Sequence, residues 1–89
     1  MALEISSDKR KPTNKLLNIL ANNIKSLRKE HNLTQEGLGE KCEFHPTFIS
    51  LIERRQRNVT LSTIEVIANA FAVEPYELLK ENQRPSDEF

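Results

Sequence analysis

Three arginines, Arg54, Arg55 and Arg57, stand within four positions of the chain and are followed by Asn58. A guanidinium group donates hydrogen bonds in a fork that fits phosphate oxygens and the O6 and N7 atoms of guanine. The segment therefore suits contacts with phosphates beside a DNA groove. The alternative is a solvated basic loop without a ligand, and the residues that precede the segment favour the DNA interpretation.

Those preceding residues have the pattern of an amphipathic helix that begins at Pro46. At roughly 100° per residue, Phe48, Ile49 and Ile52 share one side of the helix and are expected in the core. The opposite side carries one cation, two hydroxyl groups and an apolar side chain, contributed by Pro46, Thr47, Ser50, Leu51 and Arg54. Glu53 lies beside the core face, so no carboxylate on the outward side would repel phosphate.

A second, shorter helix is expected just before this one. Thr34 is a good N-cap for a helix that ends near Cys42, with Gln35 and Glu36 in its first turn. Pro46 suits the first position of the next helix, so only residues 43–45 connect the two. Such a short connection makes the helices cross steeply, as in a helix-turn-helix.

Apolar residues at helical spacing predict a helix before this pair, from Thr13 or Asn14 to Glu30 or His31, ended by Asn32 in the left-handed region. Its apolar residues are Leu16, Leu17, Leu20, Ile24 and Leu27. Residues 1–15 are interpreted as a flexible basic arm. Its lysines and arginine would reach DNA, or it is simply a solvated tail.

Two further helices are expected after the arginines. Thr60 is expected to cap a helix over residues 61–72, with Val66 outside and with Leu61, Ile64, Ile67, Ala68 and Phe71 facing inward. Pro75 is expected to begin a last helix over residues 75–81, whose Tyr76, Leu78 and Leu79 have too little chain around them to be wholly buried. Residues 82–89 are expected to be a disordered tail. The sequence thus predicts an all-α protein of five helices, with its domain at residues 16–81.

The length, charge and cysteine content of the sequence restrict which classes of function are possible. The 89 residues suffice for one domain, and 13 basic residues balance 13 acidic ones, so bulk charge does not attract nucleic acid. Residues 1–57 hold eleven Lys and Arg against seven Asp and Glu, whereas residues 58–89 hold two against six. This asymmetry would turn the basic half towards DNA. The single cysteine, Cys42, excludes an internal disulfide and a cysteine-rich zinc site and is expected in the core.

The sequence resembles the helix-turn-helix family of phage repressors and Cro proteins, and within it most the controller proteins of restriction–modification systems. The resemblance covers about residues 20–79. The general family pattern is carried by Thr34, Gln35, Leu38, Gly39, Ile49, Ser50, Ile52, Glu53 and Leu61, and the controller pattern by residues 48–54 and 57–60. The resemblance implies a five-helix lambda-repressor-like domain, a bacterial or phage origin and a transcriptional regulator that acts as an activator, a repressor or both.

Two positions depart from the family pattern. Family members usually carry Gly where Glu43 stands and often carry Gly where Arg55 stands. Both turns must therefore form without the residue that best tolerates a positive φ. We expect a slightly altered turn or modest strain at Glu43 within an unchanged fold.

The resemblance also assigns roles to residues. It implies that Arg28 pairs with Glu53, and both lie at the edges of apolar faces that must meet, where an unpaired charge is costly. Candidates for DNA base contacts are Pro46, Thr47, Ser50, Leu51, Arg54 and Arg57, of which the controller pattern favours Thr47 and Arg57. Candidates for phosphate contacts are Gln35, His45, Arg55 and Asn58. The family dimerises through the C-terminal region, which implies an interface at Tyr76, Leu79 and Val66.

The expected partners are double-stranded DNA, a second copy of the chain and, for an activator, RNA polymerase. No cofactor or metal is expected, because the sequence has no Gly-rich phosphate loop, nucleophile elbow or metal-ligand spacing. An enzyme is therefore disfavoured. An antitoxin that binds a toxin as well as DNA is the alternative, although only the first 15 residues or the tail could hold the toxin. With no membrane-length apolar run and no signal peptide, the cytoplasm is the expected location.

Overall fold

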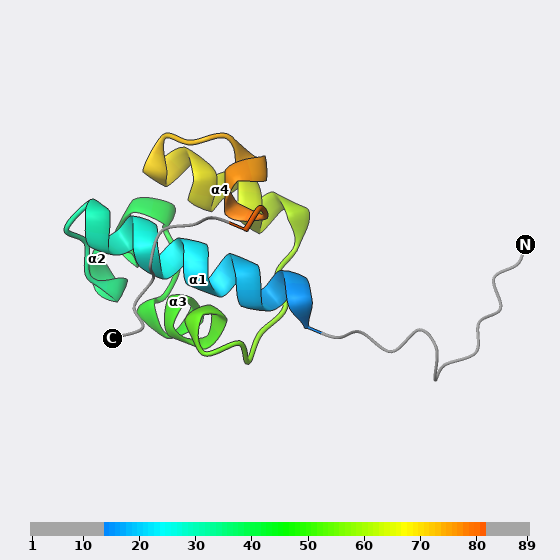
Figure 1. Ribbon diagram of the computed structural model, residues 1–89. Coiled ribbons are helices and arrows are strands. Elements are labelled where there is room, and N and C mark those ends of the chain that lie inside the picture. Colours follow the sequence, from blue (N-terminus) through cyan, green and yellow to red (C-terminus); the bar gives the residue numbers. More distant parts are fainter. Residues whose placement is uncertain (1–13, 82–89) are drawn as a thin grey trace, which may run out of the picture.

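The computed structural model describes residues 14–81, within which the chain is entirely helical outside its turns (Figure 1). The elements are α1 (Lys15–Glu30), α2 (Gln35–Cys42), α3 (Pro46–Glu53), α4 (Leu61–Phe71) and a 3₁₀ helix, η1 (Pro75–Leu78). The arm expected over residues 1–15 and the tail expected over residues 82–89 lie outside the described residues, apart from residues 14 and 15.

Helix α1 crosses the middle of the molecule, with α3 on one side and α4 and η1 on the other (Figure 1). α2 packs against α3 and also touches α4. One apolar core joins all five elements, and its fully enclosed side chains are Ile24, Leu38, Ile49, Ile52, Ile67, Phe71 and Leu78. Within this core, α3 packs mainly against α2 and α1.

The helices begin and end close to the predicted residues, for the expected local reasons. Thr34 Oγ1 accepts a hydrogen bond from the Gly37 N–H at 2.8 Å, and Thr60 Oγ1 accepts one from the Thr63 N–H at 3.1 Å. These side chains satisfy N–H groups that a helix start leaves without partners. Asn32 ends α1 with a φ of 58°, and the Leu33 N–H bonds back to the Arg28 carbonyl at 2.8 Å.

The prediction of five α-helices was wrong at the C-terminal end of the described chain. Residues 14–81 contain four α-helices, and the segment expected to be a helix over residues 75–81 is a 3₁₀ helix that ends at Leu78. The side chain of Asn23 explains this short element. Its Nδ2 group donates to the carbonyls of Leu78 and Lys80, each at 2.9 Å, and approaches that of Glu77 at 3.3 Å. A buried amide from α1 thus takes the place of further α-helical turns in satisfying these carbonyls.

Two predictions about single leucines were also wrong. Leu78 was expected to stay partly exposed but is fully buried, because α1 and α4 both pack on η1. Leu61 was expected in the core but is 79% exposed. It is the first residue of α4, and a helical side chain points back towards the N-terminus, past the end of the core. Leu16, the second residue of α1, is likewise 59% exposed at the start of its helix.

No helix within residues 14–81 combines the length and the apolarity needed to cross a bilayer.

Candidate nucleic-acid interface

The turn between α2 and α3 is built from residues 43–45, as predicted. Glu43 has a φ of 61°, in the left-handed region, without being a glycine. The turn is closed by the Phe44 N–H, which donates to the Gly39 carbonyl at 2.8 Å. A Cβ on Gly39 would lie 2.7 Å from the Phe44 carbonyl oxygen, so the turn can come this close to α2 only because Gly39 has no side chain.

Helix α3 begins with two residues that set its direction. The Nδ1 atom of His45 accepts a hydrogen bond from the Thr47 N–H at 3.0 Å, and Pro46 occupies the first helical position. His45 was predicted as a phosphate contact, and in the structure it is the exposed N-cap of α3. An N-cap at the start of a helix lies where backbone N–H groups and the helix dipole favour an anion.

The two sides of α3 separate as the helical wheel predicts. Ile49 and Ile52 are fully buried, and Phe48 is half-buried, with its ring 5.0 Å from that of Phe44 in an edge-to-face arrangement. On the other side Thr47 is exposed, while Pro46, Ser50 and Leu51 are half-buried. The outward side therefore offers hydroxyl and apolar groups on a short, firmly anchored helix.

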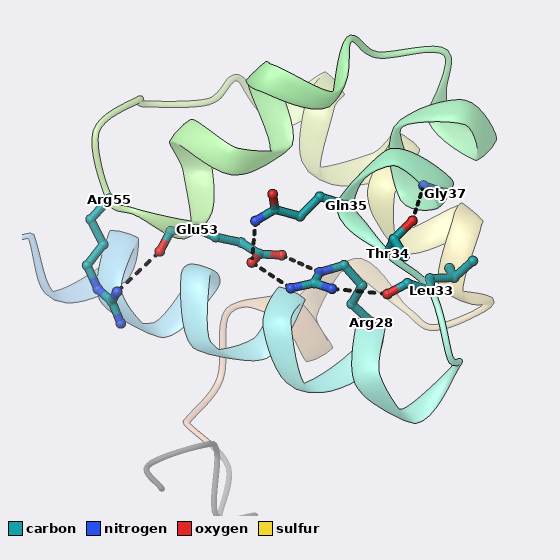
Figure 2. A network of polar contacts seen from close by, with 7 residues as sticks. All are labelled: Arg28, Leu33, Thr34, Gln35, Gly37, Glu53 and Arg55. Carbon is teal, nitrogen blue, oxygen red and sulfur yellow. Dashed lines mark hydrogen bonds and ion pairs between the residues drawn. The ribbon is translucent and has the colours of Figure 1, made fainter.

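The carboxylate of α3 is turned away from that outward side. Glu53 is 3% exposed, and its two carboxylate oxygens accept hydrogen bonds from Arg28 Nε at 2.7 Å and Arg28 Nη2 at 3.0 Å (Figure 2). Gln35 Nε2 donates to Glu53 Oε1 at 3.1 Å, and Arg28 Nη1 donates to the Leu33 carbonyl at 3.0 Å. The network ties α1 and α2 to the end of α3. It also employs the amide of Gln35, which was predicted as a phosphate contact.

The three arginines that follow α3 differ in their surroundings. Arg54 and Arg57 are exposed, and the guanidinium carbon of Arg57 lies 5.3 Å from the centre of the Phe48 ring. This is the range of a cation–π contact, which restricts where the Arg57 side chain can point. Arg55 instead reaches back to α1, where its guanidinium donates to Asn18 and Asn22. Asn58 is exposed.

The residues predicted for a dimer interface lie on α4 and around η1. Val66 is 37% exposed and Tyr76 is 62% exposed, whereas Leu79 is half-buried against the core. Lys80 Nζ lies 5.9 Å from the centre of the Tyr76 ring. Tyr76 is therefore the largest apolar surface that these three residues present to a partner.

Cys42 is a core residue, as predicted, and it ends α2. Burial raises the pKa of its thiol above 9.0, against the smaller opposing effect of the nearby Lys41 cation.

Sequence reasoning missed three contacts at this site. It placed Phe48 in the core without its contact to Arg57, and it gave Asn18 and Asn22 no role. The two asparagines stand four residues apart, which places them on one face of α1, and this spacing is a signal that could have indicated a shared partner. The distant partner itself, Arg55, cannot be read from that spacing.

Comparison with known proteins agrees with this geometry. A helix-turn-helix family model (HTH_3) matches residues 24–78. The control protein C.SmaI of Serratia marcescens is 50% identical over 52 residues, 58% of this chain and 62% of that protein. The control protein C.BamHI of Bacillus amyloliquefaciens is 40% identical over 68 residues, 75% of this chain and 84% of that protein.

Among solved structures, the restriction-modification controller protein C.AhdI from Aeromonas hydrophila is similar at a TM-score of 0.67. It is 34% identical, over 70% of this chain and 94% of that chain. The match to the family model covers more than half of the 89 residues. The chain therefore belongs to the helix-turn-helix family.

Proposed function

We propose that the protein is a sequence-specific DNA-binding regulator of transcription that binds a pseudo-palindromic operator as a homodimer. The observation that carries the proposal is the separation of charge on α3 and the residues after it. Between Phe44 and Ile64 the sequence holds one carboxylate, Glu53, and that carboxylate is buried against Arg28. Arg54 and Arg57 are exposed in the same region. This segment attracts phosphate and has no exposed carboxylate of its own to oppose it.

Sequence would be read from the outward side of α3 in the major groove. Thr47 can bond to either kind of base, Leu51 can contact a thymine methyl group, and Arg57 can bond bidentately to guanine. The Phe48 ring under Arg57 supports this role, because it limits the positions of the guanidinium before DNA arrives. Arg54, Pro46 and Ser50 complete the proposed base-contacting surface.

Phosphate contacts would set the register of the protein on DNA. The start of α2 at Gln35, the N-cap His45 and the exposed Asn58 are the proposed positions. Because Gln35 Nε2 already bonds to Glu53, its orientation is fixed by the same network that holds α3. The phosphate contacts and the base-reading helix would then move together as one unit.

A single helix-turn-helix makes few contacts, so two copies are needed for firm binding. The proposed dimer contact uses the exposed Tyr76, with Val66 and Leu79 beside it. Two-fold symmetry would place the two recognition helices about 34 Å apart, one turn of DNA.

The relatives C.SmaI and C.BamHI are named control proteins, and C.AhdI is named a restriction-modification controller. We propose the same role here, with the promoter of the protein's own gene as target and RNA polymerase as the partner when the protein activates. The family consists of DNA-binding transcription regulators rather than enzymes. The antitoxin alternative is not favoured, since these relatives are control proteins.

Footprinting on the DNA upstream of the protein's own coding sequence tests the proposal. The expected result is protection of two half-sites related by a two-fold axis, with centres about 10 base pairs or a multiple of that apart. Uniform, sequence-independent protection at all protein concentrations would contradict it.

A further inference from the structure

The side chain of Arg55 makes its hydrogen bonds with other residues of the chain. Its Nε donates to Asn18 Oδ1 at 2.8 Å and its Nη2 donates to Asn22 Oδ1 at 2.7 Å. Its Nη1 donates to the Glu53 carbonyl at 3.2 Å, a contact drawn in Figure 2. Three of the guanidinium's donors therefore bond within the chain, and two of them cross from the loop after α3 to α1.

The backbone at Arg55 explains why such an anchor is useful. Arg55 has a φ of 61°, a left-handed conformation that side-chain-bearing residues adopt at a cost. It turns the chain out of α3, with its N–H bonded to the Ile52 carbonyl at 2.9 Å and the Gln56 N–H bonded to the Leu51 carbonyl at 2.9 Å. A glycine would make this turn more easily but would have no side chain to hold it.

We propose that Arg55 is a positioning residue whose clamp on Asn18 and Asn22 fixes the loop of residues 54–60 and thereby aims Arg54 and Arg57 at DNA. This inference rests on the proposed function and assigns Arg55 a role other than the phosphate contact expected from the sequence. Arg54 and Arg57 flank Arg55 in the chain, so an anchored Arg55 limits the movement of both. Asn18 and Asn22 thereby contribute to DNA recognition through Arg55, without contacting DNA themselves.

Because the partners of Arg55 are neutral, the position of its side chain can be changed without changing its charge. Both asparagine oxygens belong to neutral amides, so the positive charge of Arg55 is not cancelled by its partners. Replacing the asparagines therefore removes the clamp and leaves the charge of the loop unchanged. If Arg55 served only as a phosphate ligand, freeing its side chain would leave DNA affinity unchanged or increase it.

The test compares the wild-type chain with the double variant Asn18→Ala/Asn22→Ala. Two duplexes are used, one selected from a random pool by the wild-type protein and one with that sequence scrambled. We expect the double variant to bind the selected duplex about tenfold more weakly and the scrambled duplex nearly as well as wild type, since a misaligned arginine loses base readout. Because the clamp lies at the surface, the thermal midpoint should change little. Asn69→Ala, which removes an exposed asparagine on α4, is the control and should match wild type.

NMR of the free protein provides a second readout that does not depend on DNA. The Arg55 Nε–H signal should exchange slowly in the wild type and quickly in the double variant, and backbone amides of residues 54–58 should gain motion. Asn18→Asp retains an acceptor oxygen for the Arg55 Nε–H, so it should restore the slow exchange that Asn18→Ala loses. Equal Arg55 Nε–H exchange in the wild type and the double variant would overturn the clamp. The proposal would also be overturned if the wild type and the double variant had the same ratio of affinities for the selected and the scrambled duplex. A wild-type protein that selects no duplex from the pool would instead overturn the proposed function.

Discussion

Arg28 and Glu53, 25 residues apart in the sequence, form an ion pair with two hydrogen bonds, at 2.7 and 3.0 Å, that joins α1 to the end of α3. Arg28 is 15% exposed and Glu53 is 3% exposed, so both groups are largely withdrawn from water. Removing one partner of such a pair leaves the other charge buried and uncompensated. The pair holds α3 in place and keeps its carboxylate off the outward side of that helix.

Glu53→Gln should therefore lower the free energy of unfolding by about 3 kcal/mol. The substitution keeps the size of the side chain and one acceptor oxygen but leaves Arg28 without a counter-charge. Thermal or urea unfolding followed by circular dichroism measures the change. Glu65→Gln, at an exposed position on α4, is the matched control and should unfold like the wild type. Equal unfolding curves for both variants would show that the ion pair does not stabilise the fold.

Glu43→Gly should stabilise the protein by about 0.5 kcal/mol, because glycine adopts the φ of 61° at this position without the steric cost that Glu43 incurs. Part of the gain is lost to the greater freedom of glycine in the unfolded chain. The midpoint of urea unfolding measures the effect. Lys41→Gly, inside α2, provides the comparison and should destabilise, since its backbone is helical. Destabilisation by both glycines would mean that Glu43 is not strained.

The raised pKa of the buried Cys42 thiol predicts a dependence of stability on pH. The thiol ionises more readily in the unfolded chain, where its pKa is near 9.0, than in the fold. Its contribution is fully present below this pH and is lost as pH rises through and above it. The difference in unfolding free energy between wild type and Cys42→Ala should therefore shrink between about pH 8 and pH 10. A difference that stays constant over this range would contradict the burial argument.

The local parts of the fold could be predicted because local signals set them. Thr34, Pro46 and Thr60 mark helix starts in the sequence, and the structure confirms each one. The contacts of Asn23 with η1 and with Lys80 just after it, and those of Asn18 and Asn22 with Arg55, span 33 to 57 residues. Such contacts depend on how the helices cross, which helical periodicity does not specify. The same limit explains why the burial of Leu78 and the exposure of Leu61 were predicted wrongly.

Tyr76→Asp should convert the proposed dimer to a monomer, because a carboxylate would have to be buried without a partner at the two-fold contact. Sedimentation equilibrium measures the molecular mass directly. Leu16→Asp places the same charge on another exposed apolar residue, at the start of α1, and should leave the mass unchanged. A wild-type protein that sediments as a monomer, or a Tyr76→Asp variant that remains a dimer, would exclude this interface.

The most direct test of DNA reading by α3 and the loop after it is the ratio of affinities for the operator and for a scrambled duplex, measured for wild type, Arg57→Lys and Arg57→Ala. Arg57→Lys keeps the charge but loses the bidentate fork, so it should bind scrambled DNA normally and lose about 1 to 3 kcal/mol of discrimination. Arg57→Ala should lose the same discrimination and also bind all DNA more weakly. An unchanged ratio in both variants would contradict the account.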